Sequence, residues 1–213
     1  MKKFLVCLGM ISLSSELMAR DAFVVFTPAI ERQTTSYDLK TREATQDSES
    51  NSLGSSMEGY AILIESRVSK RVSLGLDAGY VEGGKGNGSS DEIKEWRLRP
   101  YVGFRLLRYA GVNFTGKAGV GLHSLTSIVS PEQYRESEAK SSVVSTMIGA
   151  SLSYNITPMI SVTGDVLMSN MANLSFDHEL RSSDRSIAER TDYNVRYENM
   201  ERRSFRIGVG VLL

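Results

Sequence analysis

The sequence lacks the residues that most metal sites, disulfide scaffolds and nucleic-acid surfaces need. Its 213 residues contain one cysteine and two histidines, which argues against a disulfide framework and against a zinc site made of several thiolates or imidazoles. We therefore expect no metal and no other cofactor. The 25 Lys+Arg are balanced by 25 Asp+Glu, whereas nucleic-acid binders are normally basic overall. We expect no nucleic acid among the partners.

Long hydrophobic runs are missing after the N-terminal region. Two lysines, a short apolar run at Phe4–Leu13 and small residues up to Ala19 predict a secretory signal peptide over residues 1–19. The apolar run is too short for a membrane-spanning helix, which needs about 20 residues. We expect residues 20–213 to form a single domain.

The rest of the chain alternates between apolar and polar residues with a period of two. In residues 72–80, for example, Val72 and Leu74 alternate with Ser73 and Gly75. Such alternation predicts a strand with one apolar face. Most of the alternating segments have about the length that a tilted strand needs to cross a bilayer. Eight strands are predicted, at residues 22–32, 59–68, 72–80, 96–106, 112–122, 142–154, 159–168 and 205–213.

The connections between these strands alternate in length. Three of them are short, at Ser69–Arg71, Arg108–Ala110 and Asn155–Pro158. Short turns at one end and long loops at the other are typical of outer-membrane barrels. The sequence therefore predicts an all-β fold, an eight-stranded antiparallel up-and-down transmembrane β-barrel with short periplasmic turns and long extracellular loops. The long loops are expected at roughly residues 34–57, 82–94, 124–141 and 170–201.

The polar face of the strands carries charges, and this decides which face points inward. A lysine or arginine against lipid at mid-bilayer costs about 2–4 kcal/mol, so we expect the charged face inside and the apolar face outside. The interior of an eight-stranded barrel is only wide enough for side chains. We therefore expect the basic residues to pair with the acids and to block a continuous water path. This lumen charge network comprises Glu65, Asp77, Arg97, Arg99, Arg105, Lys117, Asp165 and Arg206.

Two further features concern the barrel wall. Pro28 and Pro100 lack a donor N–H inside predicted strands, which predicts either a bulge or a different strand boundary at each position. Aromatic residues on the apolar face are expected at the two membrane interfaces, where tyrosine and tryptophan are favoured. These are Tyr60, Tyr80 and Trp96 near the long loops, and Tyr109, Phe114 and Tyr154 near the short turns.

Together these patterns resemble the small eight-stranded outer-membrane β-barrels of Gram-negative bacteria, the OmpA-domain, OmpX and OmpW-like class of the porin family. The closing run Phe205–Leu213 is similar to the C-terminal assembly signal of that family. The family usually ends in an aromatic residue, whereas this sequence has Leu213. The resemblance implies transit with periplasmic chaperones and insertion by the barrel assembly machinery. It also implies a location in the outer membrane, with loops facing the exterior among lipid and lipopolysaccharide.

Three classes of function remain open at this point. The first is a scaffold that presents surface loops for interaction or adhesion with an unidentified partner, and the second is a narrow channel for small or apolar solutes. The third, a lipid-modifying enzyme, needs a nucleophile and a base. His123 and Ser124 point to opposite faces of a strand, so we expect no enzyme, and we expect His178 to be solvated. The expected surface-loop contacts are Arg181, Arg185, Arg190, Tyr193, Arg196 and Tyr197.

Overall fold

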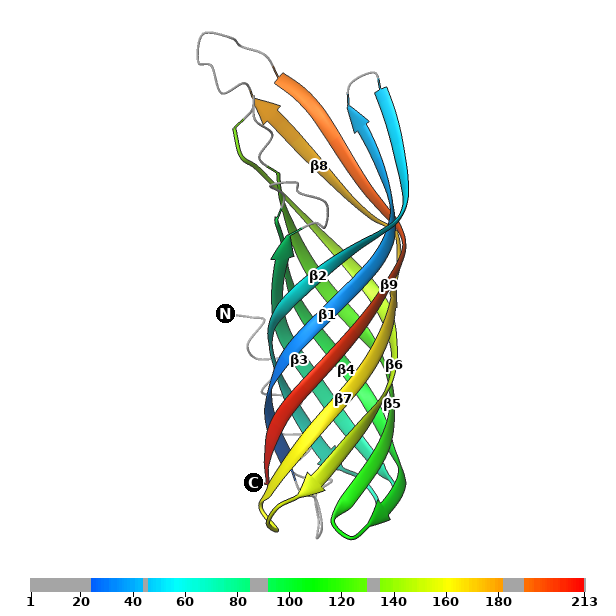
Figure 1. Ribbon diagram of the computed structural model, residues 1–213, viewed down its shortest axis with the longest axis vertical. Coiled ribbons are helices and arrows are strands. Elements are labelled where there is room, and N and C mark those ends of the chain that lie inside the picture. The colour runs from blue at the N-terminus through cyan, green and yellow to red at the C-terminus, as the bar shows by residue number, and fades with distance from the viewer. Residues whose placement is uncertain (1–23, 44–45, 85–91, 130–134, 182–189, 213) are drawn as a thin grey trace.

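The described chain is built from antiparallel strands (Figure 1). The computed structural model describes residues 24–43, 46–84, 92–129, 135–181 and 190–212, and the predicted signal peptide lies outside them. Within these residues no helix is long and apolar enough to cross a membrane. The strands are β1 (Val24–Glu43), β2 (Gln46–Arg67), β3 (Val72–Gly84), β4 (Glu92–Tyr109), β5 (Val112–Val129), β6 (Ser137–Asn155), β7 (Ile160–Met171), β8 (Leu174–Arg181) and β9 (Arg190–Leu212).

Eight of these strands form a closed ring. Their order is β1-β2-β3-β4-β5-β6-β7-β9, and pairing of β1 with β9 closes the sheet. Strand β9 is long enough to serve two partners, because residues 201–211 pair with β7 and residues 190–197 pair with β8. The β8–β9 hairpin therefore extends one side of the ring beyond β7. The predicted fold class, an all-β antiparallel up-and-down barrel, is confirmed.

The predicted long loops are wrong over much of their length, because strands continue through them. Strands β1 and β2 stay paired up to Glu43 and Gln46, and β8 and β9 up to Arg181 and Arg190. Strand β5 likewise runs to Val129 before β6 begins at Ser137. The β1–β2 and β8–β9 hairpins project from one end of the barrel (Figure 1). We call this the hairpin end, and the opposite end the short-turn end.

The polarity of the strands reverses along the barrel, which explains why the loop prediction failed. In the half nearer the short turns, outward residues are apolar, and Val102, Val120 and Ile207 are about half exposed. Towards the hairpin end, outward positions become polar and inward positions become apolar. The inward residues form the upper apolar cluster: Tyr37, Met57, Val81, Ile93, Leu125, Ala139, Val143, Met171, Leu174, Phe176, Val195, Tyr197 and Met200.

The aromatic residues of the outer surface lie where they were expected. Tyr60, Tyr80 and Trp96 stand on neighbouring strands in one row. Their rings are in contact and tilted against one another, with centroids 5.8 Å apart for the tyrosine pair and 4.8 Å apart for Tyr80 and Trp96. At the short-turn end Tyr109 and Tyr154 are more than half exposed. An apolar band thus lies between two groups of outward aromatic residues.

Pro28 and Pro100 cause neither a bulge nor the end of a strand. Partners of β1 and β9 run from Phe26 with Val211 directly to Ala29 with Gly208. The same interruption occurs beside Pro100 in the pairing of β4 with β5. In both cases the register is the same before and after the proline. The backbone pairing is therefore interrupted for a few residues and then resumes in the same register.

We predict that a charge in the centre of the apolar band destabilises the barrel. Val120→Arg is expected to cost about 2–4 kcal/mol because the guanidinium is placed against lipid at mid-bilayer. Ser142→Arg is the matched control, since Ser142 also faces outward but lies in the row of Trp96 at the edge of the band. There the cost is expected to be about 0–1 kcal/mol. Reversible unfolding in lipid vesicles measures both values, and equal costs would contradict the assignment of the band.

Candidate functional site: the filled lumen and the hairpin end

The centre of the lumen holds a network of ion pairs. The Asp77 carboxylate accepts a hydrogen bond from Arg99 Nε at 2.8 Å and lies 2.8 Å from Arg206 Nη1. Arg206 also reaches Asp165 at 3.5 Å, and Lys117 Nζ donates to Asp165 at 3.0 Å. The side chains of these five residues are at most 3% exposed. Two acids therefore hold three bases together in a space closed to solvent, and each acid has two basic partners.

Strand register brings the members of this network together. Asp77 on β3 lies directly opposite Arg99 on β4, and Asp165 on β7 lies directly opposite Arg206 on β9. Arg206 joins the two pairs, since it contacts acids on β3 and β7. Because β1 and β2 separate β9 from β3 in the ring, the contact between Arg206 and Asp77 crosses the lumen.

A second polar group lies next to this network, towards the hairpin end. Arg97 forms an ion pair with Glu31, and its Nη1 donates to Gln33 Oε1 at 3.2 Å. Arg97 is thus inside as predicted, but its acidic partner is Glu31. Arg202 and Glu95 form a further buried ion pair. Sequence reasoning missed Glu95 and Arg202 because they lie just before the predicted strands 96–106 and 205–213. Extending the alternation of these two strands by one to three residues would have placed both side chains inside.

Glu95, His123 and Ser145 form a hydrogen-bonded chain inside the barrel. His123 Nδ1 is 2.7 Å from Glu95 Oε1, and His123 Nε2 is 2.7 Å from Ser145 Oγ. This is the connectivity of a nucleophile, base and orienting acid. However, Ser145 is 2% exposed and Glu95 is also bound by Arg202, so the hydroxyl is closed off from solvent. The chain acts as part of the filling of the lumen.

Two members of the predicted network lie outside it. Arg105 is at the short-turn end, where its Nη1 donates to the Lys70 carbonyl at 3.2 Å. A register irregularity between Arg105 and Leu107 separates this end of β4 from the regular ladder. Glu65 accepts a hydrogen bond from the Tyr101 hydroxyl at 3.0 Å. The prediction of Arg105 and Glu65 as ion-pair partners within the network is therefore corrected.

The upper apolar cluster fills the lumen beyond the polar groups. The Tyr197 ring packs edge-on against Tyr37, with centroids 5.0 Å apart, and against Phe176 at 5.8 Å. Tyr197 is 1% exposed, so its prediction as a surface contact is wrong. Asn199, with a φ of 50°, produces an irregularity in the β1–β9 register, and this lets both Tyr197 and Met200 point inward.

His178 also departs from its prediction. It is 2% exposed, and its Nε2 lies 3.3 Å from Ser127 Oγ. The reason is that residues 174–181 form strand β8, whose alternate side chains face the interior. The expectation of a solvated loop histidine is therefore wrong.

The remaining predicted surface residues lie on the β8–β9 hairpin or outside the described chain. Arg181 and Arg196 are exposed and pair with Glu179 at 2.8 Å and Glu198 at 2.9 Å, respectively. Arg190 and Tyr193 belong to β9 through their backbone pairing. Arg185 lies outside the described residues.

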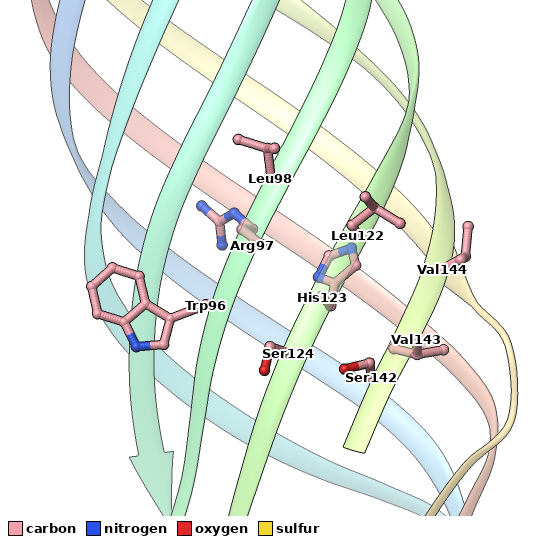
Figure 2. A pocket seen from close by; sticks show the side chains of 9 residues that line it. All are labelled: Trp96, Arg97, Leu98, Leu122, His123, Ser124, Ser142, Val143 and Val144. Carbon is pink, nitrogen blue, oxygen red and sulfur yellow. The ribbon is translucent and has the colours of Figure 1, made fainter. Parts of the chain in front are cut away.

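A shallow hollow of about 510 Å³ lies on the outer wall over β4, β5 and β6 (Figure 2). Ser124 and Ser142 are adjacent to each other in the row that begins at Trp96, and their short side chains leave the space open. Ser124 is exposed here while His123 is buried, so the two do not form a dyad. The outward wall of the hollow consists of Trp96, Leu98, Leu122, Ser124, Ser142 and Val144.

Comparisons with known proteins identify the fold. No family model and no curated protein matches the chain. The solved structure of neisserial surface protein A is 12% identical, with a TM-score of 0.54 over 90% of this chain and 99% of that chain. OprG, an outer membrane protein from Pseudomonas aeruginosa, is 10% identical, with a TM-score of 0.56 over 90% and 95% of the two chains. The outer membrane protein AlkL, solved in lipid bilayers, is 9% identical, with a TM-score of 0.52 over 91% of each chain. The chain therefore has the fold of the small outer-membrane β-barrels.

We predict that removing the shared acid of the central network is strongly destabilising. Asp77→Asn leaves Arg99 buried without its carboxylate and Arg206 with Asp165 alone, and breaking such a buried pair costs about 3–5 kcal/mol. The control is Glu58→Gln, which removes a partner of Arg32 in an exposed pair 3.9 Å apart; such pairs contribute about 0–1 kcal/mol. Chemical denaturation in detergent micelles measures both, and a loss below about 1 kcal/mol for Asp77→Asn would refute its central position.

A glycine inside the barrel and a glycine on its outer face provide a second prediction. A Cβ at Gly75 would overlap the Tyr101 ring, whereas a Cβ at Gly116 would meet its nearest atom, Leu106 Cδ1, at 3.7 Å. Gly75→Ala is therefore expected to cost about 1–3 kcal/mol through overpacking. Gly116→Ala is expected to be neutral or slightly stabilising. Thermal unfolding of the two variants compares them directly, and the reverse order would contradict the packing of Tyr101 against β3.

Proposed function

We propose that this protein is a non-conducting outer-membrane scaffold that presents its projecting hairpins for interaction or adhesion. The observation that carries the proposal is a lumen filled at two successive levels. In the central network, Asp77, Arg99 and Arg206 are at most 2% exposed. In the upper apolar cluster, Val81 and Val195 are fully buried. Residues that no water molecule can touch at two levels argue against a continuous water path.

The chemistry of the filling also favours a permanent plug. Moving Arg206 aside would leave Asp77 with Arg99 alone and Asp165 with Lys117 alone. Breaking buried ion pairs in this way costs several kcal/mol. The upper apolar cluster adds a second barrier, because it draws on residues from most of the strands in the ring. A gate would have to disrupt both layers.

The hairpins supply the surface for a partner. Their outward faces carry Arg181 and Arg196, each beside a glutamate, and their inward faces are anchored by Phe176 and Tyr197 in the upper apolar cluster. Binding residues are commonly held on loops or extensions that a rigid scaffold positions. A filled barrel with paired hairpins is such a scaffold.

The proposed setting is the outer membrane, with the hairpin end towards the exterior. The fold, the apolar band and the predicted signal peptide support this location. It entails transit with periplasmic chaperones, insertion by the barrel assembly machinery, and contact with lipid and lipopolysaccharide. The buried position of Ser145 supports a non-enzymatic role.

Single-channel recording in planar bilayers tests the plug. The purified barrel is expected to show no stable openings. D77A/R99A/R206A is also expected to stay closed because the second polar group and the upper apolar cluster remain. Frequent openings of the unmodified protein that respond to Arg99→Ala would refute the proposal and favour the channel.

Shortening the β8–β9 hairpin in cells that display the protein tests the surface role. Residues 178–193 can be replaced by Asn-Gly, because Asp177 and Asn194 face each other across the hairpin. The dipeptide Asn-Gly favours a tight hairpin turn between two such positions. Phe176 and Tyr197 stay in place, so the barrel is retained. Adherence to wells coated separately with a matrix protein and an anionic polysaccharide is expected to fall. Unchanged adherence to both, for this variant and for one shortened in the β1–β2 hairpin, would remove the binding role.

A further inference from the structure

Charge is distributed unevenly at the short-turn end of the barrel. Three segments, residues 65–74, 104–115 and 152–163, contain the three short turns and the strand ends beside them. They contain five basic residues and one acid, Glu65, within the part of the chain that the structure describes. All the basic residues lie on the β2–β3 and β4–β5 connections, and none lies on the β6–β7 connection. We call them the basic rim: Arg67, Lys70, Arg71, Arg105 and Arg108.

The basic rim is a continuous surface on one side of the barrel. Arg105 and Arg71 lie on adjacent strand ends, with the Arg105 amide donating to the Arg71 carbonyl at 2.7 Å. Arg67, Arg105 and Arg108 lie within electrostatic range of one another, and Glu65 is the acid that faces them. Glu65 is itself bound by the Tyr101 hydroxyl. The rim therefore keeps a net positive charge of several units.

The β2–β3 turn holds its basic side chains on a fixed backbone. Ser69 Oγ accepts hydrogen bonds from the amides of Arg71 at 3.2 Å and Val72 at 3.0 Å. Arg105 fixes the same turn through the Lys70 carbonyl. Lys70 and Arg71 are exposed at its tip, so their charges are presented without a large loss of backbone freedom on binding.

Apolar side chains border the basic rim on the outward face. Val68, Leu74, Phe104 and Leu106 are each about half or more exposed, and they belong to the same strand ends. A ligand that fits both surfaces has an anionic head beside an apolar chain. That combination distinguishes a lipid from a soluble anion.

We propose that the basic rim binds the phosphate headgroups of anionic phospholipids in the leaflet at the short-turn end, with their acyl chains against the neighbouring apolar residues. Basic residues near a membrane surface each attract anionic lipid by about 1 kcal/mol. The proposed orientation of the barrel makes this the periplasmic leaflet, so the inference rests on the proposed function only for the choice of leaflet.

The hairpin end has no equivalent excess of positive charge among its described outward residues. There Lys94 lies 3.4 Å from Glu92, and Lys140 lies 3.0 Å from Glu138. Arg32 similarly pairs with Glu58. These three basic residues therefore provide a matched control, since K94Q/K140Q/R32Q removes the same number of charges from the opposite end.

Native mass spectrometry of barrels released from nanodiscs tests the proposal. The nanodiscs contain equal amounts of phosphatidylcholine and phosphatidylglycerol in both leaflets, so orientation and conductance do not affect the result. The unmodified protein is expected to retain phosphatidylglycerol preferentially. In K70Q/R71Q/R108Q this preference is expected to fall about fivefold or more, while the control triple variant keeps it. Arg105 is left in place because it supports the β2–β3 turn. Arg67 is also unchanged, so each triple variant removes three charges.

Several outcomes would overturn the proposal. These are an equal retention of both lipids by the unmodified protein, an unchanged preference in K70Q/R71Q/R108Q, and an equal fall in the control variant. A further arm adds poly-glutamate to the protein in phosphatidylcholine alone; rim-dependent binding there, without any lipid preference, would identify an acidic protein as the partner. If the triple variant fails to fold, raising the salt concentration with the unmodified protein replaces it, since screening is expected to abolish the preference.

Discussion

An eight-stranded ring encloses a space that only side chains can fill, and the rest of the molecule depends on how that space is filled. The centre is occupied by charged groups, which are tolerated away from water only when they are paired. Asp77 meets this condition by facing Arg99 across one strand pair and Arg206 across the lumen. Gly75 completes the fit, because the Tyr101 ring occupies the place of the missing side chain. The register of the strands therefore determines which side chains meet in the lumen, and the size of those side chains determines where the strands need glycine.

The same strands fold in two different surroundings, and their polarity changes accordingly. On β4, Trp96 and Leu98 point outward and Arg97 and Arg99 point inward. A few residues closer to the hairpin end, Ile93 points inward. Alternation continues without a break, but the apolar residues move from the outer face to the inner face. The first arrangement suits a barrel surrounded by lipid, and the second suits β-structure surrounded by water. The hairpins can therefore remain ordered strands beyond the membrane.

This reversal also explains how much of the structure the sequence predicts. The strand segments, the turns and the inward position of Asp77, Arg99 and Arg206 follow from alternation and from the cost of a charge in lipid. The hairpin strands do not, because the prediction required an apolar outward face. Tyr197 and His178 fall in a predicted loop for that reason. His178 follows the inward parity of β8, whereas Tyr197 points inward because of the register irregularity at Asn199. The position of Arg105 depends on a register irregularity near a turn, which alternation does not encode.

A scaffold is useful only if its binding surfaces are held at a fixed height above the membrane. Under the proposed function, the adjoining rings of Tyr60, Tyr80 and Trp96 would serve this purpose on the side of the hairpin end, since such side chains favour the interface between lipid and water. They cover only part of the circumference, because Ser124 and Ser142 continue the same row. Resistance to tilting needs a second attachment at the other end. The basic rim lies on the ends of β2 and β4 and on the β2–β3 turn, and the same three strands carry the aromatic row. Attachment at both ends of these strands would fix the tilt of the barrel, and with it the direction in which the hairpins project.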